Sequence, residues 1–293
     1  MSTQANIEKM LDVYSAYGEG NAEPLCELFA PDGELRHAVP QETYPFAKPH
    51  RGPDGARAVI ALIVEDYAWL TFRSLETIAE GDTVFSITGG RIRHRASGNE
   101  AVLHLADFVR FRDGKIREYV QFFDSAGAYD WQAGHGVPAC ALMNMANKAI
   151  VNDAAETERN KRMLADAYAS YREHDVTPLL DMFADDASYN SVASVKDFRF
   201  AGPSQGRSAV VESLGRIAVD YSLVTYDTLE MVAQHDLVAV HADVAFRHRK
   251  TGKIARTEKA DVFRMQGGKV LEFNEFFDTL SARAASEAGQ RQA

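Results

Sequence analysis

The sequence has few cysteines, no long apolar run and no extended basic stretch, and each shortage excludes a class of protein. The longest purely apolar run, Ala58 to Val64, has seven residues, whereas a membrane-spanning helix needs about 20. The formal net charge is −10 and no basic run is longer than Arg247 to Lys250. Because phosphate binding requires a basic face, the sequence predicts neither a membrane partner nor a nucleic-acid partner.

The two cysteines, Cys26 and Cys140, bear on the cellular compartment. The first ten residues, MSTQANIEKM, do not combine a basic segment with an apolar one, so they do not resemble a secretory signal. Although the cysteines could pair, a large acidic chain without an export signal is expected to keep them reduced. We therefore expect a cytoplasmic protein, and 293 residues that are 46% apolar suffice for one large domain or two ordinary ones.

The chain contains an internal repeat. Shifted by 154 residues, positions 10–125 align with 164–279 without a gap, and 36 of the 116 pairs are identical. A unit of this length is too long for a solenoid repeat, so each copy should fold as a domain with its own core. We expect the two domains to pack together like the subunits of a dimer.

Within the first copy, helical patterns precede extended ones. Helices are predicted over 6–17, 22–30 and 56–67. Pro31-Asp32-Gly33 is expected to end the second helix, and Asp54 to cap the third. Extended runs follow at 83–95, 101–112 and 115–124. Each copy is therefore predicted as α+β, with an antiparallel sheet wrapped by amino-terminal helices.

The repeat also sets the expected domain boundaries. The first domain is predicted at 1–125 and the second at 153–283, with a linker at 126–152 that contains an apolar helix over 138–151. The tail at 284–293 is rich in small and polar residues, and we expect it to be flexible.

Several motifs of both copies resemble those of a known family. They are Leu28-Phe29-Ala30-Pro31-Asp32, a strand ending in His37, and the segment Asp107 to Ile116, which recurs as Asp261 to Val270. Together they resemble the nuclear transport factor 2-like superfamily, and more narrowly its SnoaL-like polyketide cyclase and ketosteroid isomerase branches. The resemblance implies two tandem cone-shaped domains, each with a curved sheet around an apolar pocket where polar side chains perform acid/base chemistry without a cofactor.

The resemblance assigns two catalytic positions in the first copy. Asp107 matches the hydrogen-bond-donating acid of ketosteroid isomerase, and His37 falls where that enzyme has its basic carboxylate. An imidazole titrates near neutrality and can act as a base, although a surface or structural role is the alternative for His37. The tyrosine of the isomerase does not carry over, since Val13 stands at its position and Tyr14 is expected to point elsewhere.

Strand periodicity independently supports a pocket around Asp107. One face of its strand is otherwise apolar: Leu103, Leu105, Val109 and Phe111. Desolvation on this face would raise the pKa of Asp107 and keep it protonated as a donor. The alternative is a structural carboxylate that binds an arginine such as Arg110 or a backbone amide.

Five residues of the first copy are candidate substrate contacts: Tyr44, Lys48, Trp69, Tyr119 and Gln121. The aromatic rings could stack on a flat substrate. Trp69 could instead belong to an ordinary aromatic core, and the charge of Lys48 to a solvated loop.

The second copy supplies Asp261 as a third catalytic candidate and Glu275 as a further substrate contact. His241 and Asp243 share one face of the preceding strand, and the sequence leaves open whether that face lines the pocket. Because Ser191 stands where the first copy has His37, and cannot act as a base unaided, we expect the main site in the first copy.

These features predict a cofactor-independent acid/base enzyme, of lyase, dehydratase, isomerase or cyclase type. Its substrate is expected to be a small hydrophobic molecule, aromatic or polycyclic, with a hydroxyl or carbonyl group. No metal-ligand spacing, phosphate loop or nucleophile elbow is present in the sequence, so no cofactor and no metal are expected. The alternatives are a non-catalytic binding or assembly module of the same fold, and an epoxide hydrolase, whose chemistry requires an Asp-Arg-Asp set. Sheet faces could also pair copies of the chain in a homo-oligomer.

Overall fold

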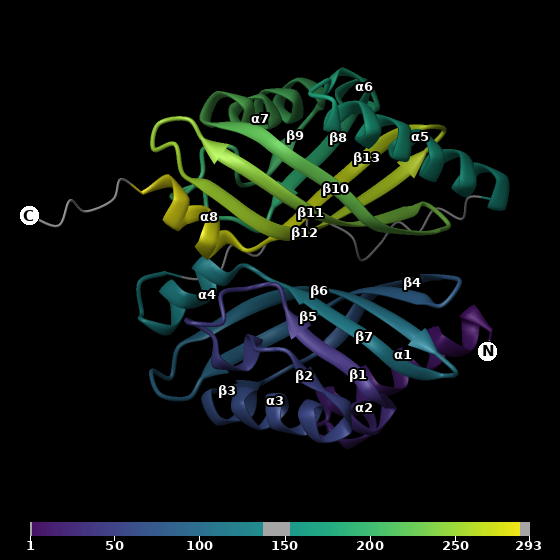
Figure 1. Ribbon diagram of the computed structural model, residues 1–293, viewed down its shortest axis with the longest axis vertical. Helices are drawn as coiled ribbons and strands as arrows, with labels where there is room; N and C mark the ends of the chain where they lie inside the picture. The colour runs from purple at the N-terminus through teal and green to yellow at the C-terminus, as the bar shows by residue number, and fades with distance from the viewer. Residues whose placement is uncertain (1, 137–152, 288–293) are drawn as a thin grey trace, which may run out of the picture.

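The computed structural model describes residues 2–136 and 153–287, which form two α+β domains of the same design (Figure 1). The helices of the first domain are α1 (Thr3–Gly18), α2 (Glu23–Leu28), α3 (Gly52–Asp66) and α4 (Ser125–Gln132), with a 3-10 turn at Pro45–Ala47. Its strands are β1 (Phe29–His37), β2 (His50–Arg51), β3 (Tyr67–Trp69), β4 (Arg73–Glu80), β5 (Thr83–His94), β6 (Glu100–Arg112) and β7 (Lys115–Phe122).

The second domain repeats this order. Its helices are α5 (Ala154–Arg172), α6 (Thr177–Asp181), α7 (Arg207–Asp220) and α8 (Thr279–Ser286). Its strands are β8 (Phe183–Ser191), β9 (Ser204–Gln205), β10 (Tyr221–Gln234), β11 (Leu237–His248), β12 (Ile254–Gln266) and β13 (Lys269–Phe277). The repeat seen in the sequence is therefore a repeat of whole domains.

Each sheet is mixed, whereas the sequence predicted a purely antiparallel one. The strand order is β2-β1-β7-β6-β5-β3, with β4 also on β5, and β10-β11-β12-β13-β8-β9 in the second domain. β1 runs parallel to β7, and β8 runs parallel to β13. A helix follows the first strand of each domain, and the antiparallel strands come after that helix. The last of these strands can therefore lie beside the first strand and run parallel to it.

Two local predictions about helix ends were wrong. α2 ends at Leu28, and Pro31-Asp32-Gly33 lies inside β1, where the pairing with β7 shifts register. A bulge near a sheet edge tolerates a proline, because its missing N–H is not needed there. α3 begins at Gly52, and Asp54 forms an ion pair with Arg57 instead of capping the helix.

The two sheets pack against each other, with the long helices on the outer sides (Figure 1). Phe85, Phe108 and Phe122 of the first domain belong to one apolar cluster with side chains of the second domain. The ring of Phe108 stacks on His241, with centroids 5.2 Å apart. This contact settles which face of β11 lines the second pocket, since the His241 face meets the first domain; Asp243, on the same face, is exposed. The face-to-face packing agrees with the expectation of a dimer-like pair.

Ion pairs reinforce the contact between the domains. Arg36 binds both carboxylate oxygens of Glu258, at 2.7 and 2.9 Å, and Glu258 also lies 2.6 Å from His241. Arg36 precedes His37, and Glu258 precedes Lys259. Successive strand residues point to opposite faces. His37 and Lys259 therefore point into the cavities of their own domains.

The segments between and after the domains differ in part from the prediction. The expected linker begins with α4, and α8 extends three residues past Arg283 into the expected tail. Ser125 donates a hydrogen bond to Asp278 at 2.6 Å, which ties these two helices together. The helix predicted over 138–151, Cys140 and residues 288–293 lie outside the described residues. No helix of the described segments is long and apolar enough to cross a membrane.

Candidate active site

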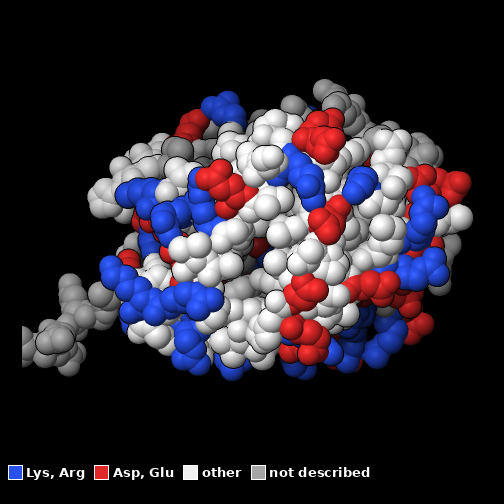
Figure 2. Space-filling view, turned by 90° about the horizontal axis from the view of Figure 1, so that it is seen from above, with Lys and Arg blue, Asp and Glu red and all other residues white. Residues whose placement is uncertain are grey.

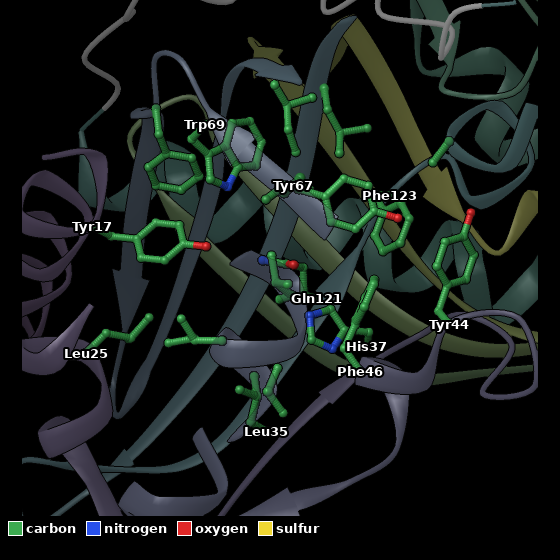
Figure 3. A pocket seen from close by; sticks show the side chains of 18 of the residues that line it. Tyr17, Leu25, Leu35, His37, Tyr44, Phe46, Tyr67, Trp69, Gln121 and Phe123 are labelled. Carbon is green, nitrogen blue, oxygen red and sulfur yellow. The ribbon is translucent and has the colours of Figure 1, made fainter. Parts of the chain in front are cut away.

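The first domain has an aromatic cavity between its sheet and helices α1 and α3 (Figure 3). Of the described residues that line it, none is a lysine, arginine, aspartate or glutamate. Among the described lining residues, side-chain polar atoms come from His37, Gln121, Gln132, the tyrosine hydroxyls and the indole nitrogens of Trp69 and Trp131. The larger apolar rings in the wall are Phe29, Phe46, Phe72, Phe123, Trp69 and Trp131. Such a cavity suits an uncharged, flat ligand.

His37 is placed at the end of β1, as the sequence predicted, and lines the cavity. Its side chain is buried, and Nδ1 has no hydrogen-bond partner among the described residues. Burial, with a smaller contribution from the nearby His50, lowers the pKa of His37 to about 4. The imidazole is therefore neutral at neutral pH.

Asp107 lies behind the cavity wall. It is fully buried and is not among the lining residues. Tyr14 and Thr88 donate hydrogen bonds to Oδ2, at 3.2 and 3.0 Å, and Gln121 donates to Oδ1 at 2.8 Å. Burial raises the pKa of Asp107 to about 6 although these donors oppose the rise. The carboxyl group therefore does not line the cavity itself, but it is hydrogen-bonded to two residues that do, Tyr14 and Gln121.

Gln121 connects the two predicted catalytic residues. Its Nε2 donates a hydrogen bond to Asp107 Oδ1. Its interaction with His37 opposes the fall in the pKa of His37 that burial causes. Both Gln121 and His37 line the cavity.

The expectation that Tyr14 points elsewhere was wrong. Tyr14 lines the cavity, and its hydroxyl lies 3.4 Å from that of Tyr119. The error came from carrying over a helix register by position: Val13 is buried on a neighbouring face of α1, and one residue turns a helix by about 100°. The repeat held a usable signal, because Tyr14 pairs with Tyr168.

The remaining predicted contacts divide into two groups. Tyr44, Trp69 and Tyr119 line the cavity with Gln121. Trp69 also packs edge-on against Phe72, with ring centroids 4.9 Å apart, so it is part of the aromatic core as well as of the wall. Lys48 is exposed and does not line the cavity, as expected for a residue of a solvated loop.

The second domain has a cavity of different chemistry. Lys259 on β12 lies between two carboxylates: Nζ is 3.0 Å from Asp261 Oδ1 and forms a short ion pair with Glu275. All three side chains are buried. Although burial acts in the opposite direction, the two carboxylates raise the pKa of Lys259. Burial, with Glu275 adding to it, raises the pKa of Asp261.

Tyrosines complete the hydrogen bonds of both carboxylates. Tyr168 and Tyr226 donate to Asp261 Oδ2, at 2.5 and 2.9 Å, and Tyr189 donates to Glu275 Oε2 at 3.0 Å. Tyr168, which donates to Asp261, is the repeat counterpart of Tyr14, which donates to Asp107. The second site is nevertheless charged where the first is neutral.

Lys259 is the residue that sequence reasoning missed. It stands two positions before Asp261 on the same strand face, and the repeat pairs it with Leu105. Both the spacing along the strand and the repeat alignment could have been used to find Lys259 from the sequence. Ser191, which pairs with His37, is buried, and its hydroxyl accepts a hydrogen bond from the Ala193 amide at 3.2 Å.

The described residues contain no group of three or more histidine, cysteine, aspartate or glutamate side chains arranged to hold a metal. Cys26 is a free, buried thiol.

The geometry of both domains agrees with one family. The SnoaL-like domain family matches residues 9–119 and again residues 164–273. The chain belongs to the SnoaL-like domain family. No curated protein matches the sequence.

Solved structures resemble single domains of this tandem SnoaL-like chain. A nuclear transport factor 2-like protein from Burkholderia thailandensis is 24% identical, with a TM-score of 0.40, and the match covers 44% of this chain and 97% of that one. A similar protein from Burkholderia xenovorans is 22% identical, with a TM-score of 0.40 and coverages of 45% and 98%. A protein of ketosteroid isomerase-like fold from Catenulispora acidiphila, in complex with trimethylamine, is 16% identical, with a TM-score of 0.37 and coverages of 43% and 93%.

Proposed function

We propose that the first domain is a cofactor-independent acid/base enzyme that moves a proton on a small, uncharged aromatic or polycyclic carbonyl compound. One observation carries the proposal. The buried imidazole of His37 lines a cavity walled by aromatic rings, and its Nδ1 has no hydrogen-bond partner among the described residues. A buried polar atom in this condition is costly unless a ligand or water pairs with it.

In the proposed reaction, the His37 imidazole takes a proton from the carbon next to the substrate carbonyl. The C–H electron pair forms a double bond to the carbonyl carbon, and the C=O π pair moves onto the carbonyl oxygen as negative charge. Tyr14 gives its hydroxyl proton to Asp107, so the donor in this part of the wall is the hydroxyl of Tyr119, 3.4 Å from that of Tyr14, and a donor of this kind stabilises such an enolate. Return of the proton to another carbon gives an isomer, and loss of a β-hydroxyl gives a dehydration product.

The low pKa of His37 fits a role that depends on the bound substrate. At neutral pH the free imidazole is in the base form. A developing enolate inside the apolar cavity attracts the imidazolium more strongly than water does. Formation of the enolate therefore raises the basicity of His37 at the step that needs it.

Deuterium exchange tests the proposal without knowledge of the natural substrate. Tetralone and benzyl methyl ketone are incubated with the protein in D2O, and loss of the signal of the carbon-bound protons is followed by NMR. We expect catalysed exchange that falls on the order of 100-fold or more in His37→Gln. Ser191→Ala, at the matching position of the second domain, is the control and should leave exchange unchanged.

Two results would count against the proposal. Exchange that persists in His37→Gln places the base elsewhere. Binding of the ketones with no exchange above the buffer rate favours the alternative, a non-catalytic module that uses the same cavity for recognition.

The second domain supports a second candidate function, epoxide hydrolysis. The observation that favours it is the Glu275–Lys259–Asp261 set, in which one cation separates two buried carboxylates. Its order of charges, negative, positive and negative, is that of the Asp-Arg-Asp set that epoxide hydrolysis requires. The raised pKa of Asp261 suits the acid, which leaves Glu275 as the base.

The candidate reaction needs only water and the epoxide. Glu275 accepts a proton from a water molecule while the water oxygen attacks one ring carbon. The C–O bond on that carbon breaks, and protonated Asp261 gives its proton to the leaving oxygen, so the product is a vicinal diol. Proton transfer from Glu275 to Asp261 through solvent restores the site.

Hydrolysis in ¹⁸O-labelled water tests this second candidate. Stilbene oxide should give a diol with one labelled oxygen, and Glu275→Gln should abolish turnover while His37→Gln leaves it unchanged. Turnover that survives Glu275→Gln would contradict the assignment.

A further inference from the structure

The ion pair of the second domain stands between two cavities. The larger is lined by Tyr168, Asp261 and the inner faces of α6 and α7. The smaller lies on the other side and is lined by Phe198, Phe200 and Phe277. Lys259 and Glu275 line both. A ligand that reaches the ion pair therefore has space on two sides of it.

The first domain has one cavity where the second has two. In the repeat, Phe46 corresponds to Phe200 of the smaller cavity, and Tyr14 corresponds to Tyr168 of the larger one. Both Phe46 and Tyr14 line the single first cavity. The long Lys259 side chain, in place of Leu105, thus puts a charged group at the centre of a space that is apolar and continuous in the first domain.

Lys259 has a donor left for a ligand. An ammonium carries three N–H groups: one donates to Glu275 Oε1, and Nζ lies 3.0 Å from Asp261 Oδ1. Tyrosine hydroxyls donate to Asp261 Oδ2 and Glu275 Oε2, whereas Asp261 Oδ1 has no hydrogen-bond partner among the described residues. Of the two ion-pair residues that line both cavities, Lys259 offers a donor, which can bind an oxygen acceptor.

The two cavities differ in access and size. Figure 2 looks onto the second domain and shows a hollow with acidic atoms visible at its bottom. His174, Arg249 and Ser222 are among the polar residues that line the larger cavity. Apart from Lys259, Glu275 and Thr257, the smaller cavity has only apolar and aromatic walls, and Ala255 and Ala282 leave the space between its rings. It matches one phenyl ring or a short branched alkyl group.

We propose that the second domain binds a compound with one oxygen function between two apolar arms, with the oxygen on Lys259 and one arm in each cavity. The proposal deepens the second candidate function by naming its substrate class, an epoxide substituted on both carbons, and rests on that candidate for the reaction only. Binding of an unreactive analogue is independent of turnover.

Isothermal titration calorimetry with two ketones tests the proposal. Dibenzyl ketone has two arms and benzyl methyl ketone has one. We expect dibenzyl ketone to bind the second domain at least about tenfold more tightly, because it buries a second ring. Ala282→Leu fills the smaller cavity and should remove this advantage while leaving the affinity for benzyl methyl ketone unchanged. Lys259→Met should weaken both ketones.

The repeat provides a matched control, because Ala128 is the first-domain counterpart of Ala282 and lines the first cavity. Heat that Ala128→Leu removes belongs to the first cavity and is subtracted. Should Ala282→Leu unfold the protein, Ala255→Val, which narrows the same cavity from β12, takes its place. Equal affinity for the two ketones, or an advantage that survives both variants, would overturn the proposal.

The outcomes separate this inference from the candidate reaction. Preferential binding of dibenzyl ketone with no hydrolysis of stilbene oxide supports the two-armed site and rejects the hydrolase. Hydrolysis of styrene oxide and stilbene oxide with equal efficiency supports the hydrolase and rejects the two-armed site.

Discussion

Leu105 and Lys259 occupy the same position of equivalent strands, β6 and β12, and they give the two cavities opposite electrostatic character. Around Leu105, no charged side chain of the described residues lines the cavity. Around Lys259, two buried carboxylates accompany the ammonium group. Two differences between the copies, Leu105 against Lys259 and Gln121 against Glu275, thus separate a cavity without charged lining residues from an ionic one.

Removing Lys259 alone should destabilise the second domain strongly. Lys259→Leu leaves Asp261 and Glu275 buried without their cation, and such a loss costs about 3–5 kcal/mol. The double variant Lys259→Leu/Glu275→Gln copies the Leu105 and Gln121 pair of the first domain and should recover most of this free energy of unfolding. Urea denaturation of both variants checks the prediction, and a double variant no more stable than the single one would contradict it.

His37 should make the protein less stable as the pH falls. The folded pKa is about 4 and the reference value is 6.5, so the unfolded state binds more protons between these pH values. Stability is therefore lost as pH falls from about 6.5 to 4, by on the order of 3 kcal/mol. Denaturation curves of His37→Gln should lack this decline, whereas Ser191→Ala should keep it.

Asp107 should act in the opposite direction over part of the same range. Its folded pKa is about 6 against 3.8, so the folded state holds the extra proton, and stability falls as pH rises from 3.8 to 6. Above pH 6 the penalty is constant, on the order of 3 kcal/mol. Because His37 acts in the opposite direction over most of this interval, we expect Asp107→Asn to gain free energy of unfolding relative to the wild type as the pH rises from 3.8 to 6. An Asp107→Asn variant with the pH dependence of the wild type would show that Asp107 is ionised throughout.

The aromatic contact between the sheets should hold the domains together. Phe108 is buried and stacks on His241, and truncating a buried phenylalanine costs about 3–5 kcal/mol. We expect Phe108→Ala to increase proteolytic cleavage between the domains as well as to lower the melting temperature. His241→Gln, which keeps Phe108 and loses only the stacked ring, should have a smaller effect on both measurements.

Much of the fold could be predicted because the chain is duplicated. The gap-free repeat identified whole domains, and alternation along β6 and β7 placed Asp107, Tyr119 and Gln121 on the face that surrounds the first cavity. The parallel pairing of β1 with β7 could not be read from alternation, because a strand's pattern of apolar residues is the same for either direction of its neighbour.

The candidate site could be predicted only in part, because the direction of a side chain depends on the exact register of its helix or strand. His37 was found at a strand end, where one residue of register matters little. Tyr14 was misplaced because a one-residue error on a helix turns a side chain away from its true direction. Lys259 was overlooked because a lysine on an apolar face reads as an exception, and only its two carboxylate neighbours from β12 and β13 explain its burial.

Both tryptophans of the chain, Trp69 and Trp131, line the first cavity, and the second domain has none. Excited with light that tyrosine does not absorb, the protein should therefore emit from the first site alone. A ligand that enters the first cavity should change the intensity or wavelength of this emission, whereas a ligand in either cavity of the second domain should leave it unaltered. The chain carries its own spectroscopic label for telling the two sites apart.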